Sequence, residues 1–252
     1  MQLQGQVAVI TGAGSGFGRA TALRFATEGA RVLAADVNEA AARETAEMVR
    51  AAGGEAQPHR VDVSRGPEVQ AMVQAAVDRW GRLDVLFNNA GVPQRPTPTE
   101  EVTEEFWDRL MAVNVRGVFL GTKHAIPVMK RQGRGCIINT ASTMGVRARP
   151  QYAAYVTSKG AVILFTRSVA LELAPHKIRA NVIAPAGADT PMLTQFFSGK
   201  SREEARAAFL PSIPLGRLIE ADDVAKAALY LASDLAEMIT GHVLEVDGGR
   251  AI

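Results

Sequence analysis

Short apolar runs rich in β-branched residues alternate with longer segments of helical periodicity along the whole chain. We predict strands at 7–11, 31–36, 55–61, 83–87, 135–140, 178–184 and 242–246, and helices at 16–28, 39–52, 67–80, 104–132, 151–173, 191–210 and 221–233. This alternation is typical of βαβ units on a parallel sheet. Because the runs are continuously apolar, both faces of the sheet should be covered by helices. The pattern therefore predicts one doubly wound α/β domain spanning residues 1–252, with about seven parallel strands.

The composition excludes several other classes of protein. The 28 basic and 26 acidic side chains give a net charge of +2, which does not favour a nucleic-acid partner. No apolar run approaches the ~20 residues of a membrane helix, so no membrane partner is expected. Cys136 is the single cysteine, and an internal disulfide cannot form. We therefore expect a cytoplasmic protein. The four histidines are scattered, and no metal site is predicted.

A glycine-rich loop, Thr11-Gly12-Ala13-Gly14-Ser15-Gly16-Phe17-Gly18, joins the first predicted strand to the first predicted helix. Glycines at positions 12, 16 and 18 would let the backbone turn tightly, approach a pyrophosphate and pack helix against strand. Asp36 ends the second predicted strand, about 20 residues after the loop, where an acidic side chain can accept hydrogen bonds from an adenosine ribose. Asn38 is the better N-cap for the helix that follows. The combination predicts a Rossmann fold that binds NAD, with NADP disfavoured.

Three side chains form a candidate catalytic group. Tyr155 and Lys159 are four residues apart, so on a helix they lie one turn apart on the same face. A phenol has a pKa of about 10, and a nearby ammonium favours the phenolate that a base requires. Ser142 follows a predicted strand and precedes this helix, so it can reach the same point from the sheet. Cys136, inside a predicted strand, is better explained as a core residue than as a catalytic thiol.

These motifs, in this order, resemble the single-domain short-chain dehydrogenase/reductase family from Gln6 to Gly249. The resemblance implies a catalytic tetrad of Asn114, Ser142, Tyr155 and Lys159, in which the tyrosine is the acid/base, the serine holds the substrate oxygen and the lysine binds the nicotinamide ribose. It also implies a kink at Asn114 and a water that links Lys159 to solvent.

The resemblance further identifies a cofactor site. Asp62-Val63 matches the family's adenine contact. In Asn88-Asn89-Ala90-Gly91, the first Asn and the Gly match residues beside the adenosine, and Thr190 matches a carboxamide contact. The full implied set is Gly12, Ser15, Gly16, Phe17, Gly18, Asp36, Val37, Asp62, Val63, Asn89, Ala90, Gly91, Tyr155, Lys159, Pro185, Gly187, Ala188, Thr190 and Met192.

One segment departs from the family pattern. Where the family usually has Asn-x-x-x-Pro-Gly, this chain has Asn181-Val182-Ile183-Ala184-Pro185-Ala186-Gly187. If positive φ is needed there, Gly187 would have to supply the turn. The resemblance implies a substrate lid at about 186–214. We expect Met192 and Phe196 of this lid to join Ser142 and Tyr155 in binding the substrate, which favours apolar alcohols over sugars. Arg147 and Arg149 offer the alternative of a clamp for an anionic substrate.

The predicted function is an NAD-dependent oxidoreductase that interconverts a secondary alcohol and a ketone. The alternatives are a 3-oxoacyl thioester reductase, acting on an acyl carrier protein substrate, and a non-catalytic dinucleotide-binding sensor. The resemblance also implies a homotetramer. The expected contacts are apolar residues on the helices at 104–132 and 151–173, namely Val115, Val118, Phe119, Phe165 and Val169.

Overall fold

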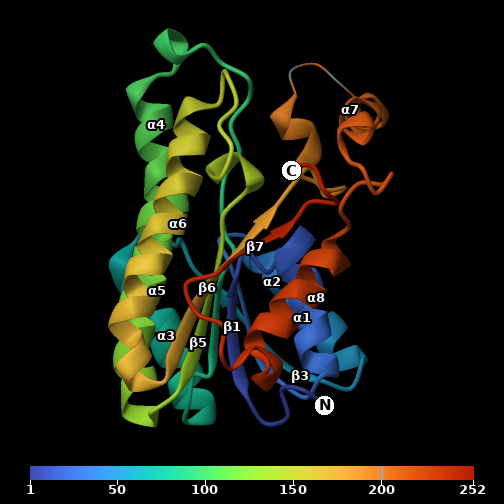
Figure 1. Cartoon of the computed structure of the whole chain (residues 1–252). Helices are drawn as coiled ribbons and strands as arrows, with labels where there is room; N and C mark the ends of the chain where they lie inside the picture. Colours follow the sequence, from blue (N-terminus) through green and yellow to red (C-terminus); the bar gives the residue numbers. More distant parts are fainter. Residues whose placement is uncertain (198, 200) are drawn as a thin grey trace.

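Figure 1 shows the computed structural model, which describes residues 1–197, 199 and 201–252. Its strands form one seven-stranded sheet in the order β3-β2-β1-β4-β5-β6-β7, and every neighbouring pair is parallel. The strands are β1 (Val7–Thr11), β2 (Arg31–Asp36), β3 (Glu55–Arg60), β4 (Val85–Asn88), β5 (Gly135–Thr140), β6 (Ile178–Pro185) and β7 (Val243–Val246). The predicted doubly wound parallel sheet is confirmed.

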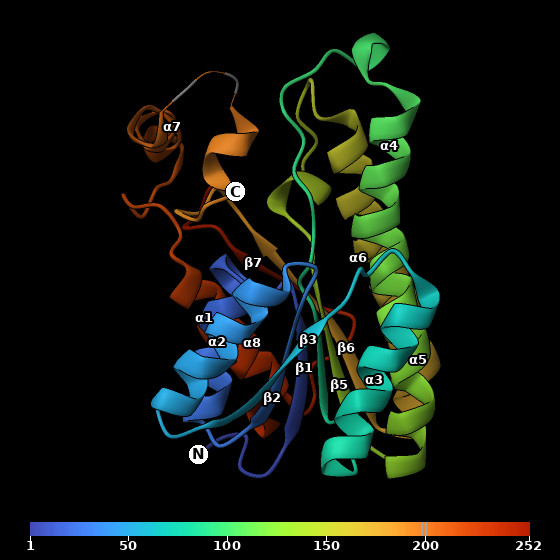
Figure 2. The ribbon, with the colours of Figure 1, turned by 180° about the vertical axis from the view of Figure 1, so that it is seen from behind.

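Helices cover both faces of this sheet (Figures 1 and 2). On one face lie α1 (Gly16–Thr27), α2 (Glu39–Ala51) and α8 (Ala221–Ala232); on the other lie α3 (Gly66–Trp80), α4 (Glu104–Met111), α5 (Gly117–Gln132) and α6 (Ala153–Leu173). Successive strand residues point to opposite faces, so Ile10 packs with Phe25 of α1 while Val9 packs with Met72 of α3. Two cores explain why the strands are apolar in continuous runs.

The helix expected at 104–132 is divided. A π-helical turn, Ala112–Arg116, lies between α4 and α5 and contains Asn114. Single π turns inside longer helices are frequent at functional sites.

The prediction of one helix at 191–210 is wrong. The structure has a short 3-10 turn at Leu193–Phe196 and a separate helix α7 (Arg202–Phe209). Between them Phe197 is extended and Gly199 has φ +70°, and neither conformation continues a helix. A capping box of Ser201 and Glu204 then starts α7 independently. The segment lies with the C-terminus above the sheet (Figure 1).

The apolar residues expected to contact a second subunit are only partly available. Val118 and Val169 are buried within the chain, at 4% and 7% exposed. Phe119 is exposed, and so are Leu164 and Leu171 on α6. The periodicity of apolar residues could not show which side of α5 and α6 packs against the sheet and which side is exposed. Within the described part of the chain, no helix is long and apolar enough to cross a membrane.

Candidate active site

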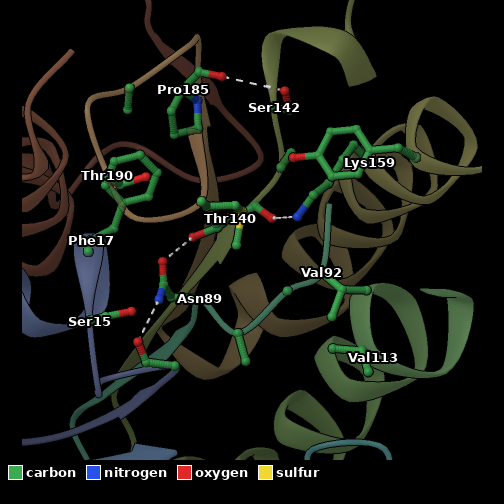
Figure 3. Close-up of a pocket in the computed structure, with 18 of the residues that line it drawn as sticks. Ser15, Phe17, Asn89, Val92, Val113, Thr140, Ser142, Lys159, Pro185 and Thr190 are labelled. Carbon is green, nitrogen blue, oxygen red and sulfur yellow. Dashed lines mark hydrogen bonds between the residues drawn. The ribbon is translucent and has the colours of Figure 1, made fainter. Parts of the chain in front are cut away.

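A cavity of about 610 Å³ lies at the carboxyl ends of the strands. This is the end at which open α/β sheets bind ligands. Figure 3 shows part of its lining, with Ser15 and Phe17 on one side and Val92 and Val113 on the other. The sequence-predicted site residues that line it are Gly12, Ser15, Gly16, Phe17, Asp36, Val37, Asp62, Val63, Asn89, Ala90, Gly91, Ser142, Tyr155, Lys159, Pro185, Gly187, Ala188, Thr190, Met192 and Phe196. Gly18 and Asn114 lie outside this lining.

The glycine-rich loop needs its glycines for different reasons. Gly12 and Gly16 have φ of +66° and +49°, which favour glycine. A Cβ on Gly12 would also lie 3.0 Å from the Ala90 Cα. Gly18 is buried, and a Cβ there would lie 2.1 Å from the Gly12 carbonyl oxygen. Gly18 therefore permits the helix to pack on the loop, and it does not face the cavity as a ligand contact would.

Asp36 is held at the end of β2 by backbone donors. The Gly14 N–H donates to Oδ2 and the Asn38 N–H donates to Oδ1, each over 2.9 Å. Asn38 caps α2 through the Ala41 N–H, as the sequence predicts. A Cβ on Gly14 would lie 2.9 Å from Asp36 Oδ2, so glycine is required there. The local sequence does not indicate this requirement, because Asp36, whose carboxylate leaves no room for a Cβ on Gly14, is 22 residues away.

Asp62 follows β3 and lines the same part of the cavity. Its Oδ1 accepts hydrogen bonds from the Ser64 N–H and hydroxyl, over 3.0 and 2.7 Å. The hydroxyl bond is the main reason that the pKa of Asp62 lies below its usual value. This carboxylate therefore keeps its charge at neutral pH.

The two asparagines after β4 have different environments. Asn89 Nδ2 donates to the Thr11 carbonyl over 3.0 Å, and its Oδ1 accepts from the Thr140 hydroxyl (Figure 3). Asn88, in contrast, is buried and donates to Asn139 Oδ1 over 2.9 Å. The expected adenosine-side position of the first asparagine is therefore wrong. Asn88 points to the face of the sheet that α5 covers, where its Nδ2 also lies 3.4 Å from the Thr122 hydroxyl, whereas Asn89, just after the strand, reaches the cavity.

Ser142, Tyr155 and Lys159 come together as predicted, and all three are buried. Lys159 Nζ donates to the Thr140 carbonyl over 2.9 Å (Figure 3) and lies 5.6 Å from the centre of the Tyr155 ring. Burial lowers the pKa of Lys159 to about 8. Burial also raises the pKa of Tyr155 to about 12, although hydrogen bonding with Ser142 lowers it in part. The site thus holds a protonated phenol beside an ammonium that can release its proton.

Asn114 forms hydrogen bonds with residues next to Ser142, Tyr155 and Lys159 without lining the cavity itself. Its Oδ1 accepts from the Val92 N–H over 2.8 Å, and its Nδ2 donates to the Val92 carbonyl over 3.0 Å. Nδ2 also reaches the Ser158 hydroxyl of α6. A Cβ on Gly91 would lie 3.2 Å from Asn114 Oδ1 and 3.5 Å from Lys159 Nζ. Asn114 therefore ties the π turn to α6 and to the segment that follows β4.

The segment after β6 lines the cavity and has no positive φ at either Ala186 or Gly187. Positive φ is therefore not needed at this position, and Gly187 does not have to supply a left-handed turn. Gly187 instead allows close packing, because a Cβ there would lie 2.5 Å from the Phe209 ring. Phe196 packs edge-on against Tyr155, with ring centroids 5.3 Å apart. Met192 and Phe196 both line the cavity.

Three features of the site were missed. Gln94 is buried, and its Oε1 accepts from the Tyr155 N–H over 2.9 Å at the start of α6. Arg109 of α4 and Arg250 near the C-terminus line the cavity, whereas Arg147 and Arg149 do not. No sequence signal could have found these contacts, because each depends on segments far apart in the chain.

Comparison with known proteins supports this geometry. The sequence profile of a family described as enoyl-(acyl carrier protein) reductase matches residues 12–251. A 4-formylbenzenesulfonate dehydrogenase of Comamonas testosteroni is 43% identical over 252 residues, covering all of both chains. The crystal structure of a 3-ketoacyl-(acyl-carrier-protein) reductase from Brucella melitensis, complexed with NADH, has a TM-score of 0.92 and 44% identity over 99% of this chain and 100% of that one. A levodione reductase structure has a TM-score of 0.95 and 36% identity, covering 99% and 98% of the two chains. With its parallel sheet, glycine-rich loop and buried Ser142, Tyr155 and Lys159, the chain belongs to the short-chain dehydrogenase/reductase family of oxidoreductases.

Proposed function

We propose that this protein interconverts a secondary alcohol and a ketone by hydride transfer with NAD, and that Tyr155 is the general acid/base. The observation that carries the proposal is the buried group of Ser142, Tyr155 and Lys159 beside the cavity. A phenol and a hydroxyl placed together can bind one substrate oxygen and exchange its proton. A non-catalytic sensor would not require this arrangement.

The cavity has features that suit a dinucleotide. The α1 N-terminus and the open backbone at Gly12 and Gly16 would hold its phosphates. Asp36 would accept hydrogen bonds from the adenosine ribose, and Asp62 lies nearby for the adenine. When bound, the nicotinamide would accept or supply the hydride. The residues proposed for that end are Lys159, Pro185, Gly187, Ala188, Thr190 and Met192.

The proton steps are assigned to this chain's side chains. In ketone reduction, Tyr155 donates its phenolic proton to the substrate oxygen, and Ser142 holds that oxygen. The raised pKa of Tyr155, about 12, keeps this proton in place at neutral pH. In alcohol oxidation the phenolate must accept the proton, and Lys159 stabilises that phenolate for as long as the lysine is charged. Oxidation should therefore accelerate as the pH rises, whereas reduction should not.

We propose NAD over NADP because of Asp36. A 2′-phosphate beside this carboxylate would face like-charge repulsion of roughly 1 kcal/mol per charge pair in water, or about 4 kcal/mol at intermediate dielectric. Arg19, the cation on the neighbouring helix, is already paired with Glu44 and the Gly14 carbonyl. We expect kcat/KM to favour NAD by tens- to thousands-fold. Equal values for the two cofactors would contradict this assignment.

A 3-oxoacyl thioester reductase is the second candidate, because the similar Brucella melitensis protein has that name and was crystallised with NADH. The other similar proteins are named for a sulfonated aromatic aldehyde and for levodione, so similarity leaves the substrate open. Measuring reduction of an acetoacetyl thioester against reduction of a simple aryl ketone separates the two candidates.

The decisive experiment is Tyr155→Phe. We expect NADH binding, followed by nucleotide fluorescence, to be retained while turnover falls by ~10² to 10⁴. Tyr230→Phe, on the distant helix α8, is the matched control and should remain active. Near-native turnover by Tyr155→Phe would reject the mechanism.

We further propose a cytoplasmic homotetramer. Exposed apolar side chains support self-association: Leu164 and Leu171 on α6 are 67% and 80% exposed, and Met238 before β7 is 90% exposed. Leu164 and Leu171 are two turns apart and so lie on one face of α6, and exposed apolar surface that is continuous marks interaction sites. Sedimentation at micromolar concentration should give four times the chain mass of 26.8 kDa. A monomer would refute the assembly.

A further inference from the structure

The charges that line the cavity are divided between its two ends. Among the residues described, the acidic lining side chains are Asp36 and Asp62, after β2 and β3. The arginines that line it are Arg109, from α4, and Arg250, from the segment after β7. Both arginines lie on the side of the β1–β4 switch point where Tyr155 stands, away from the acidic end. The cavity is therefore acidic where the adenosine is proposed to bind and basic where the substrate is.

Arg250 has a half-buried cation without a carboxylate partner. Its guanidinium stacks on the Phe209 ring, 4.5 Å from the centroid, and its Nε donates to the Ser212 hydroxyl over 2.7 Å. In the described chain, neither terminal nitrogen of this guanidinium donates to a protein acceptor, and no ion pair includes Arg250. Four N–H donors of a partly desolvated cation are thus left for a ligand.

The nearest acid does not neutralise this charge. Asp247 favours the charged form of Arg250 through space, but its two oxygens accept the backbone N–H groups of Gly249 and Ala251. Burial and the repulsion of Arg149 together lower the pKa of Arg250 to about 10, with burial the larger cause. Arg250 remains charged at neutral pH, in a place where protein carboxylates do not compensate it.

Resting on the proposed function, we infer that the substrate carries an anionic group, a carboxylate or sulfonate, which Arg250 binds while Tyr155 and Ser142 hold the reacting oxygen. Met192 and Phe196 line the same cavity and supply apolar surface for the rest of the substrate. A guanidinium suits this task because its planar donors can bind two oxygens of a carboxylate or sulfonate at once.

A purely structural role for Arg250 makes a different prediction. Phe209 and Ser212 both belong to the segment between β6 and α8, so Arg250 also holds that segment in place. Loss of such a tether would impair all substrates alike. Loss of an anion subsite would impair only the anionic ones.

The test compares acetophenone, 4-acetylbenzoate and 4-acetylbenzenesulfonate as substrates with NADH. For the wild type we expect kcat/KM to be about tenfold or more higher for at least one anion than for acetophenone. Arg250→Gln should abolish this ratio, and Arg250→Lys should retain part of it. The control is Arg147→Gln, because Arg147 does not line the cavity; its ratio should match the wild type.

A binding measurement makes the result independent of turnover. Benzoate and benzenesulfonate should bind the NADH complex more tightly than benzamide, and Arg250→Gln should remove the difference. A proportional loss for all three ketones in Arg250→Gln, or equal binding of benzoate, benzenesulfonate and benzamide by the wild type, would overturn the inference. Preference for benzoate over benzenesulfonate, or the reverse, identifies the anion. If NADH binds but no ketone or thioester is reduced, the proposed function fails instead, while the binding result still decides the anion subsite.

Discussion

Replacing Lys159 by methionine should make the nucleotide-free protein more stable and inactive. Lys159 is 4% exposed, and burial lowers its pKa from 10.5 to about 8. Because one pKa unit corresponds to about 1.4 kcal/mol, keeping this ammonium buried at pH 7 costs about 3 kcal/mol. Methionine keeps most of the side-chain volume without the charge. Loss of the hydrogen bond to the Thr140 carbonyl offsets about 1 kcal/mol. A net gain of about 2 kcal/mol should remain.

The pH dependence isolates the titration of Lys159. Between pH 8 and pH 10.5 the native lysine is neutral while the unfolded lysine is still protonated, so the unfolded state binds more protons. The stability of the wild type therefore rises with pH in this range. The advantage of Lys159→Met should shrink by about 2–3 kcal/mol between pH 7 and pH 10. Tyr155 titrates in both proteins, and its contribution cancels in the difference.

The assay is urea unfolding by circular dichroism at pH 7, 8, 9 and 10, at one protein concentration and without nucleotide. Lys130→Met is the control, because Lys130 is exposed on α5; its difference from the wild type should not change with pH. A Lys159→Met protein that is less stable than the wild type by the same amount at every pH would refute the reasoning.

Two further substitutions test how the site is held. Gly187→Ala should raise the KM for substrate several-fold, because its Cβ would lie 2.5 Å from the Phe209 ring; steady-state kinetics checks this, and an unchanged KM would contradict it. Gln94→Ala removes the acceptor for the Tyr155 N–H and the donor to the Gln151 carbonyl, and it should cost about 1–2 kcal/mol of stability together with a fall in kcat. A thermal melt and kcat measure the two effects, and wild-type values of both would contradict the prediction.

Much of the fold and part of the site could be predicted from the sequence because they depend on local patterns. Continuous apolar runs predict strands covered on both faces, and parallel strands place their carboxyl ends at one edge. That edge brings Asp36, Ser142 and Tyr155 to one cavity. One wrong prediction also has a local cause. The single helix expected at 191–210 is divided because Gly199 cannot continue a helix and the capping box at Ser201 starts a separate one.

What the sequence by itself determined is the order of elements, the glycine-rich loop, the acidic end of the cavity and the helical pairing of Tyr155 with Lys159. Only the tertiary structure decided that Gln94 caps the helix of Tyr155, that Asn89 reaches the cavity instead of Asn88, and that Arg250 lines it while Arg147 does not. Periodicity describes neighbours within a few residues, whereas these contacts join segments 60 or more positions apart or depend on which way a side chain leaves the end of a strand. Their burial and hydrogen-bond partners exist only once the sheet has assembled.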